Sequence, residues 1–92
     1  MEIKYTPNFL LKIESIFKSN TYVIRYEKGH FNSGYCILKD KKVIVVNKFF
    51  NTEAKINCLI DILQEIEIDL SLLDDDKLEK LYLSLVVKNE VN

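Results

Sequence analysis

The sequence predicts a single α+β domain over residues 1–92, in which a helix, a three-stranded antiparallel sheet and two further helices follow in order. The helices are expected to pack on one face of the sheet. Apolar residues recur at helical spacing in three stretches, at 9–17, 56–66 and 78–85. Between the first two stretches lie three short segments rich in β-branched and aromatic residues, at 21–27, 35–39 and 42–47.

The first helix is predicted to begin at Pro7. Thr6 can cap it, and proline fits the first helical position because its missing N–H costs no hydrogen bond there. One apolar face follows at helical spacing, made of Phe9, Leu10, Ile13, Ile16 and Phe17. Ser19 and Asn20 end the pattern.

The three segments that follow predict the sheet. Residues 21–27 alternate, with Tyr22, Ile24 and Tyr26 on one face and Val23, Arg25 and Glu27 on the other. Residues 35–39 and 42–47 predict a hairpin that turns at Asp40-Lys41, although this register opposes Lys39 and Lys42, so a longer turn is the alternative. The stretch 43–46 is apolar on both faces, which indicates a central strand or one covered on both sides.

The second helix is predicted to start near Asn51 or Thr52, either of which can cap it. Its apolar arc comprises Ile56, Leu59, Ile60, Ile62, Leu63 and Ile66, whereas Asn57, Asp61, Gln64 and Glu65 face water. Cys58 falls at the edge of the arc, which predicts a half-buried thiol. After Glu65 the alternating pattern favours an extended stretch.

The last helix is predicted to begin at Asp74, with Leu73 and Leu78 at the positions of a hydrophobic staple. The acidic run 74–76 is interpreted as negative charge at the positive end of this helix. It lacks the spaced oxygen ligands and the glycine of a calcium loop, so no metal is predicted there.

Composition and the N-terminus predict a cytoplasmic protein. The chain contains two cysteines, Cys36 and Cys58, in no closely spaced framework, a pattern that suits a reducing compartment. No apolar run reaches the roughly 18 residues that span a bilayer, and Met1-Glu2-Ile3-Lys4 lacks the order of a signal peptide. We therefore predict no membrane partner.

The segment 28–34 is the candidate binding loop. It holds both glycines of the chain, Gly29 and Gly34, and its only histidine, His30. Glycine serves where the backbone needs positive φ or close approach, so the loop has a demanding shape. The candidate binding residues in and beside it are Arg25, Tyr26, Lys28, His30, Phe31 and Tyr35. The alternative is a bulged connection between strands whose aromatic residues pack locally.

The same region contains residues that suit two kinds of chemistry, a thiol nucleophile and a metal site. Cys36 lies six residues after His30, so a thiol nucleophile with an imidazole base is conceivable, with Glu27 orienting the base. His30, Cys36 and Cys58 supply three metal ligands in principle, but the paired close spacing of zinc sites is absent. No phosphate loop, dinucleotide fingerprint or zinc-protease motif appears, so no cofactor is predicted.

Charge is unevenly spread along the chain. Residues 21–50 carry six basic and two acidic side chains, a net charge of +4, whereas residues 51–92 carry four basic and ten acidic side chains, a net charge of −6. A basic sheet region with Tyr22, Tyr26, Phe31 and Tyr35 could stack on single-stranded nucleic acid. Equally, the opposite charges could attract one another, within one molecule or between two.

Two resemblances follow from the middle of the chain. Residues 25–36, Arg-Tyr-Glu-Lys-Gly-His-Phe-Asn-Ser-Gly-Tyr-Cys, followed by Val-Val-Asn-Lys-Phe at 45–49, resemble a family of uncharacterised small bacterial proteins, which implies no known activity. Residues 34–65 are similar to the hairpin and zinc helix of ImmA/IrrE-type metallopeptidases. The zinc motif His-Glu-x-x-His would fall at 60–64, where this chain has Ile-Asp-Ile-Leu-Gln and neither histidine, so no site is carried over.

The leading functional prediction is a non-enzymatic protein-interaction module, homodimeric, that uses the loop at 28–35. A hydrophobic fraction of 48% in so small a domain favours apolar surface covered by another copy or another protein. The alternatives are single-stranded nucleic-acid binding and a Cys/His thiol enzyme.

Overall fold

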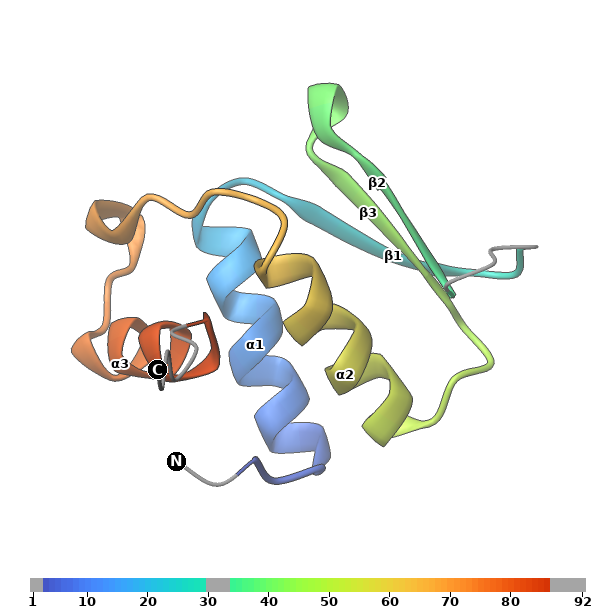
Figure 1. Ribbon diagram of the computed structural model, residues 1–92, viewed down its shortest axis with the longest axis horizontal. Helices are drawn as coiled ribbons and strands as arrows, with labels where there is room; N and C mark the ends of the chain where they lie inside the picture. Colours follow the sequence, from blue (N-terminus) through green and yellow to red (C-terminus); the bar gives the residue numbers. More distant parts are fainter. Residues whose placement is uncertain (1–2, 30–33, 87–92) are drawn as a thin grey trace, which may run out of the picture.

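The computed structural model describes residues 3–29 and 34–86, and within them it confirms an α+β fold of three helices and a three-stranded sheet (Figure 1). The elements in chain order are α1 (Pro7–Ser19), β1 (Val23–Glu27), β2 (Tyr35–Leu38), the 3-10 turn η1 (Lys39–Lys41), β3 (Val43–Asn47), α2 (Thr52–Leu63), the 3-10 turn η2 (Leu70–Leu72) and α3 (Asp76–Val86). None of the described helices is both long and apolar enough to traverse a bilayer.

The sheet is mixed, so the predicted purely antiparallel sheet is wrong. The strand order is β1-β3-β2, and β3 runs parallel to β1 and antiparallel to β2. Val43 of β3 lies opposite both Val23 of β1 and Leu38 of β2. Because β1 and β2 occupy opposite edges, the hairpin from β2 inserts β3 between them. The two-faced apolar pattern correctly predicted that β3 is central.

The connection between β2 and β3 is the longer turn. Lys39–Lys41 form one 3-10 turn, and Lys42 follows with a φ of +55°, its N–H donating to the Lys39 carbonyl at 3.1 Å. The predicted two-residue turn at Asp40-Lys41 is therefore wrong, and the longer alternative is correct. The strands consequently end at Leu38 and resume at Val43, so Lys39 and Lys42 are not opposed across the ladder.

Both predicted helix caps at α1 and α2 are confirmed. The Thr6 hydroxyl accepts a hydrogen bond from the Phe9 N–H at 3.1 Å, and the Asn51 side chain accepts one from the Ala54 N–H at 2.8 Å. The start of α3, however, is Asp76 rather than Asp74. The Asp75 carboxylate accepts the Lys77 N–H at 2.8 Å. Because Asp75 is the cap, the residue immediately before the cap is Asp74. A hydrophobic staple needs an apolar residue there, so the predicted staple with Leu73 is not formed.

The core lies between one face of the sheet and the helices. Helices α1 and α2 pack on that face, and α3 packs against α1 and α2 (Figure 1). The side chains with no exposed surface are Ile13, Ile16, Phe17, Ile44, Val46, Ile56, Leu59 and Ile62. Cys58 is buried, not half-buried as predicted, because α2 has neighbours on several sides: the sheet, α1 and α3.

Candidate functional site

The predicted site residues on the strands divide between the two faces of the sheet. Side chains alternate along a strand, and the register aligns the alternation across all three strands. One face, with Ile44 and Val46 at its centre, is covered by helices. The other, here called the open face, carries Val23, Arg25, Glu27, Cys36, Leu38, Val43, Val45 and Asn47. In the described part of the chain, Figure 1 shows no helix over this second face.

Residues on the open face form rows that change in character along the strands. The first row, Val23, Val43 and Leu38, is entirely apolar, and its edge members are 50% and 42% exposed. The second row is Arg25, Val45 and Cys36, and the third contains Glu27 and Asn47. The face therefore grades from an apolar end, near η1, to a polar end where β1 and β3 finish.

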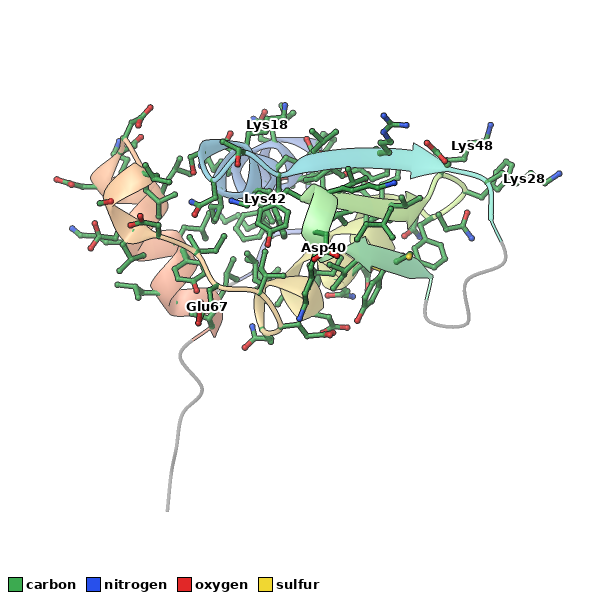
Figure 2. All side chains as sticks on the ribbon, turned by 90° about the horizontal axis from the view of Figure 1, so that it is seen from above. Lys18, Lys28, Asp40, Lys42, Lys48 and Glu67 are labelled. Carbon is green, nitrogen blue, oxygen red and sulfur yellow. The ribbon has the colours of Figure 1, made fainter. Side chains whose placement is uncertain are left out.

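Arg25 and Glu27 pair with each other on this face. The Arg25 guanidinium lies 3.6 Å from the Glu27 carboxylate, and both side chains are more than half exposed. An exposed pair of this kind adds little stability. Its effect on the surface is larger, because the two charges offset each other and leave the face close to neutral. Lys28 and Lys48 lie beyond this polar end, and Lys42 and Asp40 mark the other end of the sheet (Figure 2).

Tyr26, predicted as a binding residue, points the other way, toward the helices. Its hydroxyl donates to the Glu14 carboxylate of α1, and the Lys55 ammonium of α2 lies 4.7 Å from the centre of its ring. Burial, followed by the hydrogen bond to Glu14, raises the pKa of Tyr26 well above its ordinary value. This side chain joins β1 to both helices and is thus part of the domain's own packing.

Tyr35 also lies on the helix side of the sheet. Its hydroxyl donates to the Glu65 carboxylate at 2.9 Å, and this hydrogen bond is the main cause that raises the pKa of Tyr35 to about 12. Tyr22 is buried in the core, with its ring edge-on to Phe17. The described tyrosines of the sheet region are therefore not on the same face as Arg25.

The described ends of the candidate loop are Lys28, Gly29 and Gly34, whereas His30 and Phe31 lie outside the described residues. Gly34 is buried, has a φ of +87°, and its carbonyl accepts the Asn47 N–H at 2.9 Å. A Cβ at this position would lie 2.4 Å from the Phe50 ring. The positive φ and the nearby Phe50 ring therefore account for a glycine at position 34.

Of the residues predicted for a thiol enzyme, the two that the structure describes, Cys36 and Glu27, are not in direct contact. Cys36 on β2 and Glu27 on β1 are separated by β3, which places their strands about 9.5 Å apart. Glu27 pairs instead with Arg25. A contact of either residue with His30 falls outside the described residues, so the thiol enzyme stays a prediction. Cys58 is a poor nucleophile, because burial raises the pKa of its thiol and keeps it protonated.

No group of three or more His, Cys, Asp or Glu side chains within the described residues is arranged to hold a metal ion. The residues predicted for the site do not include the valines and Leu38, which form the apolar part of the open face. The sequence does indicate an apolar open face, because residues 43–46 are apolar on both faces of their strand. Phe49, just beyond β3, was also missed and is 69% exposed.

Comparisons with protein-family models, with curated proteins and with solved structures find no match to this chain. The two resemblances in the sequence therefore stay predictions.

Proposed function

We propose that this chain is a non-enzymatic protein-interaction module that pairs with a second copy of itself through the open face of its sheet. The observation that carries the proposal is the apolar row Val23, Val43 and Leu38 on the face that no described helix covers. An antiparallel or mixed sheet with one wet face normally presents polar side chains there. A contiguous apolar patch on such a face is typical of an interaction site.

The near-neutral charge of the face favours a second copy as the occupant. The Arg25–Glu27 pair offsets its own charges, so two identical faces can approach without net repulsion. Two sheets that meet face to face pack about 10 Å apart with their strands roughly aligned. A two-fold symmetric pair of this kind uses the same patch on both subunits.

The size of the face predicts a weak dimer. Three strands of five residues or fewer give a face of about 14 Å by 17 Å. The resulting area, about 240 Å² per partner, is below the roughly 600 Å² per partner of weak specific interfaces, so residues around the face must add to the contact and we expect a dissociation constant weaker than about micromolar. Lys28, the described start of the predicted binding loop, follows Glu27 at the polar end of the face and would lie at its rim.

The orientation of the aromatic residues supports protein over nucleic acid as the partner. Tyr22, Tyr26 and Tyr35 are occupied by contacts on the helix side and offer no stacking platform on the open face. We also place the module in the cytoplasm, because Cys36 and Cys58 are both free thiols, the form that a reducing compartment maintains.

Sedimentation velocity over a range of protein concentrations tests the proposal. The wild-type protein is expected to shift from monomer to dimer as concentration rises, whereas the double variant V23K/L38K stays monomeric. Val23 and Leu38 are exposed, so lysine at these positions leaves the core intact. The matched control is L11K/L83K, which changes two exposed leucines on helices and should dimerise like the wild type.

A wild-type protein that stays monomeric at every concentration would overturn the proposal, as would a V23K/L38K variant that dimerises normally. Circular dichroism and thermal unfolding establish that both variants fold. If V23K/L38K does not fold, hydrogen exchange on the wild type replaces it. Amides of β1 and β2 should then gain protection at high protein concentration, and unchanged protection would contradict the dimer.

A further inference from the structure

A second surface feature lies away from the sheet, where α3 begins beside α1. A cavity of about 300 Å³ opens between the segment before α1, the first half of α1 and the first turns of α3. Phe9, Leu78 and Leu81 line it with apolar surface, and Phe9 and Leu81 belong to the buried core. A cavity of this volume is at the lower end of the range for small-molecule sites.

Three lysines surround this apolar surface. Lys4 comes from the segment before α1, Lys12 from α1 and Lys77 from α3. Within residues 3–29 and 34–86 the single ion pair is Arg25–Glu27. No described carboxylate therefore forms an ion pair with any of these three lysines. Three cations around one hollow are notable in a chain whose net charge is −1.

Asp75 is the acidic residue that lines the same cavity, and it already has a role. Its carboxylate accepts the Lys77 N–H at 2.8 Å and its carbonyl accepts the Leu78 and Glu79 N–H groups, so it caps α3. The cap satisfies donors at the start of the helix that a bound anion would otherwise use. Asp75 keeps its negative charge, so the three lysines, which come from three separate segments, give the lining a net charge of +2.

We propose that this cavity binds a small amphipathic anion, whose aliphatic tail lies on Phe9, Leu78 and Leu81 and whose charged head lies among Lys4, Lys12 and Lys77. Since a cavity of about 150 Å³ holds benzene, one of twice that volume accommodates a tail of about eight carbons. Burial of the tail supplies most of the affinity. The lysines select the sign of the head group, because an exposed ammonium attracts an anion and repels a cation.

Isothermal titration of the full chain with octanoate tests the site, with three matched ligands. Octanol has the tail without the charge, acetate has the charge without the tail, and octyl phosphate exchanges the carboxylate head for a phosphate. Octanoate is expected to bind about tenfold more tightly than octanol, and acetate is not expected to bind measurably. Tighter binding of octyl phosphate than of octanoate would assign the site to phosphorylated ligands.

Variants locate the binding. The double variant K12Q/K77Q should weaken octanoate about tenfold and leave octanol unchanged, because it removes charge but little apolar surface. Lys18, an exposed lysine at the far end of α1, provides the control K18Q, which should bind octanoate like the wild type. The open-face variant V23K/L38K should also bind normally, so this site is tested independently of the proposed dimer.

Equal affinity for octanol and octanoate in the wild type would overturn the assignment, and so would the absence of octanoate binding. Unchanged octanoate affinity in K12Q/K77Q would likewise contradict it. The comparison of ligands on the wild-type protein stands even if the variants do not fold.

Discussion

The side-chain amide of Asn20 pairs in both directions with the backbone of Asp69. The Asp69 N–H donates to Asn20 Oδ1 at 2.8 Å, and Asn20 Nδ2 donates to the Asp69 carbonyl at 3.4 Å. Asn20 is only 4% exposed. The pair thus joins the end of α1 to the extended segment before η2, two parts of the chain that are 49 residues apart.

Replacing Asn20 by Ala should destabilise the protein by about 1–3 kcal/mol, because the Asp69 N–H loses its partner in a partly buried position. Urea unfolding followed by circular dichroism measures the change. The control is Asn57→Ala, which removes an exposed hydrogen bond to Tyr5 and should cost less than about 0.5 kcal/mol. Similar small losses in both variants would contradict a structural role for Asn20.

Gly34→Ala should lower the free energy of unfolding by about 2 kcal/mol or more. The new methyl group would meet the Phe50 ring, and the φ of +87° strains any residue with a Cβ. In a double-mutant cycle with Phe50→Ala, part of the loss should be recovered, because the clash disappears while the backbone strain remains. Strict additivity of the two changes would indicate that Gly34 and Phe50 do not touch.

The Tyr35–Glu65 pair should contribute stability that depends on alkaline pH. Because folding raises the pKa of Tyr35 from 10.0 to about 12, the contribution is complete below pH 10 and is lost as pH rises through 12. Absorbance of tyrosinate follows the titration. Glu65→Gln should lower the pKa of Tyr35 toward 10, and Tyr35→Phe should remove this step. An unchanged titration in Glu65→Gln would exclude the hydrogen bond as the cause.

The two cysteines should differ in their alkylation by iodoacetamide. Cys58 is buried and its pKa is raised by burial, so it should react at least about tenfold more slowly than Cys36. If the open face forms the dimer, the reaction of Cys36 should slow as protein concentration rises, whereas that of Cys58 should not. Peptide mass spectrometry distinguishes the sites. Reaction of Cys36 faster than that of a free peptide thiol would instead favour the thiol enzyme.

The helix caps and the central strand were predictable from sequence, because each depends on residues that are neighbours in the chain. Thr6 and Asn51 have side chains that cap a helix, and both do so. The stretch 43–46 is apolar on both faces, and β3 is central. The start of α3 was misplaced by two residues because three consecutive aspartates can each act as a cap, and only the packed structure selects Asp75.

Strand order and the use of each face depend on contacts distant in sequence. Nothing in residues 21–27 specifies whether β1 pairs with β2 or with β3, and the parallel pairing with β3 decides the topology. The alternation did separate Arg25 from Tyr26. The packing of α1 and α2 decides which of the two faces the helices cover, and it places Tyr26 on the covered face and Arg25 on the open one.

The insertion of β3 between β1 and β2 has a consequence for the order of assembly on the ribosome. Val23 pairs with Val43, which is synthesised 20 residues later, so β1 has no neighbouring strand until β3 has been made. Pairing across such a separation closes a loop and slows folding. During synthesis, therefore, α1 and β1 emerge without a strand partner, and the sheet can close only once Asn47 has left the exit tunnel.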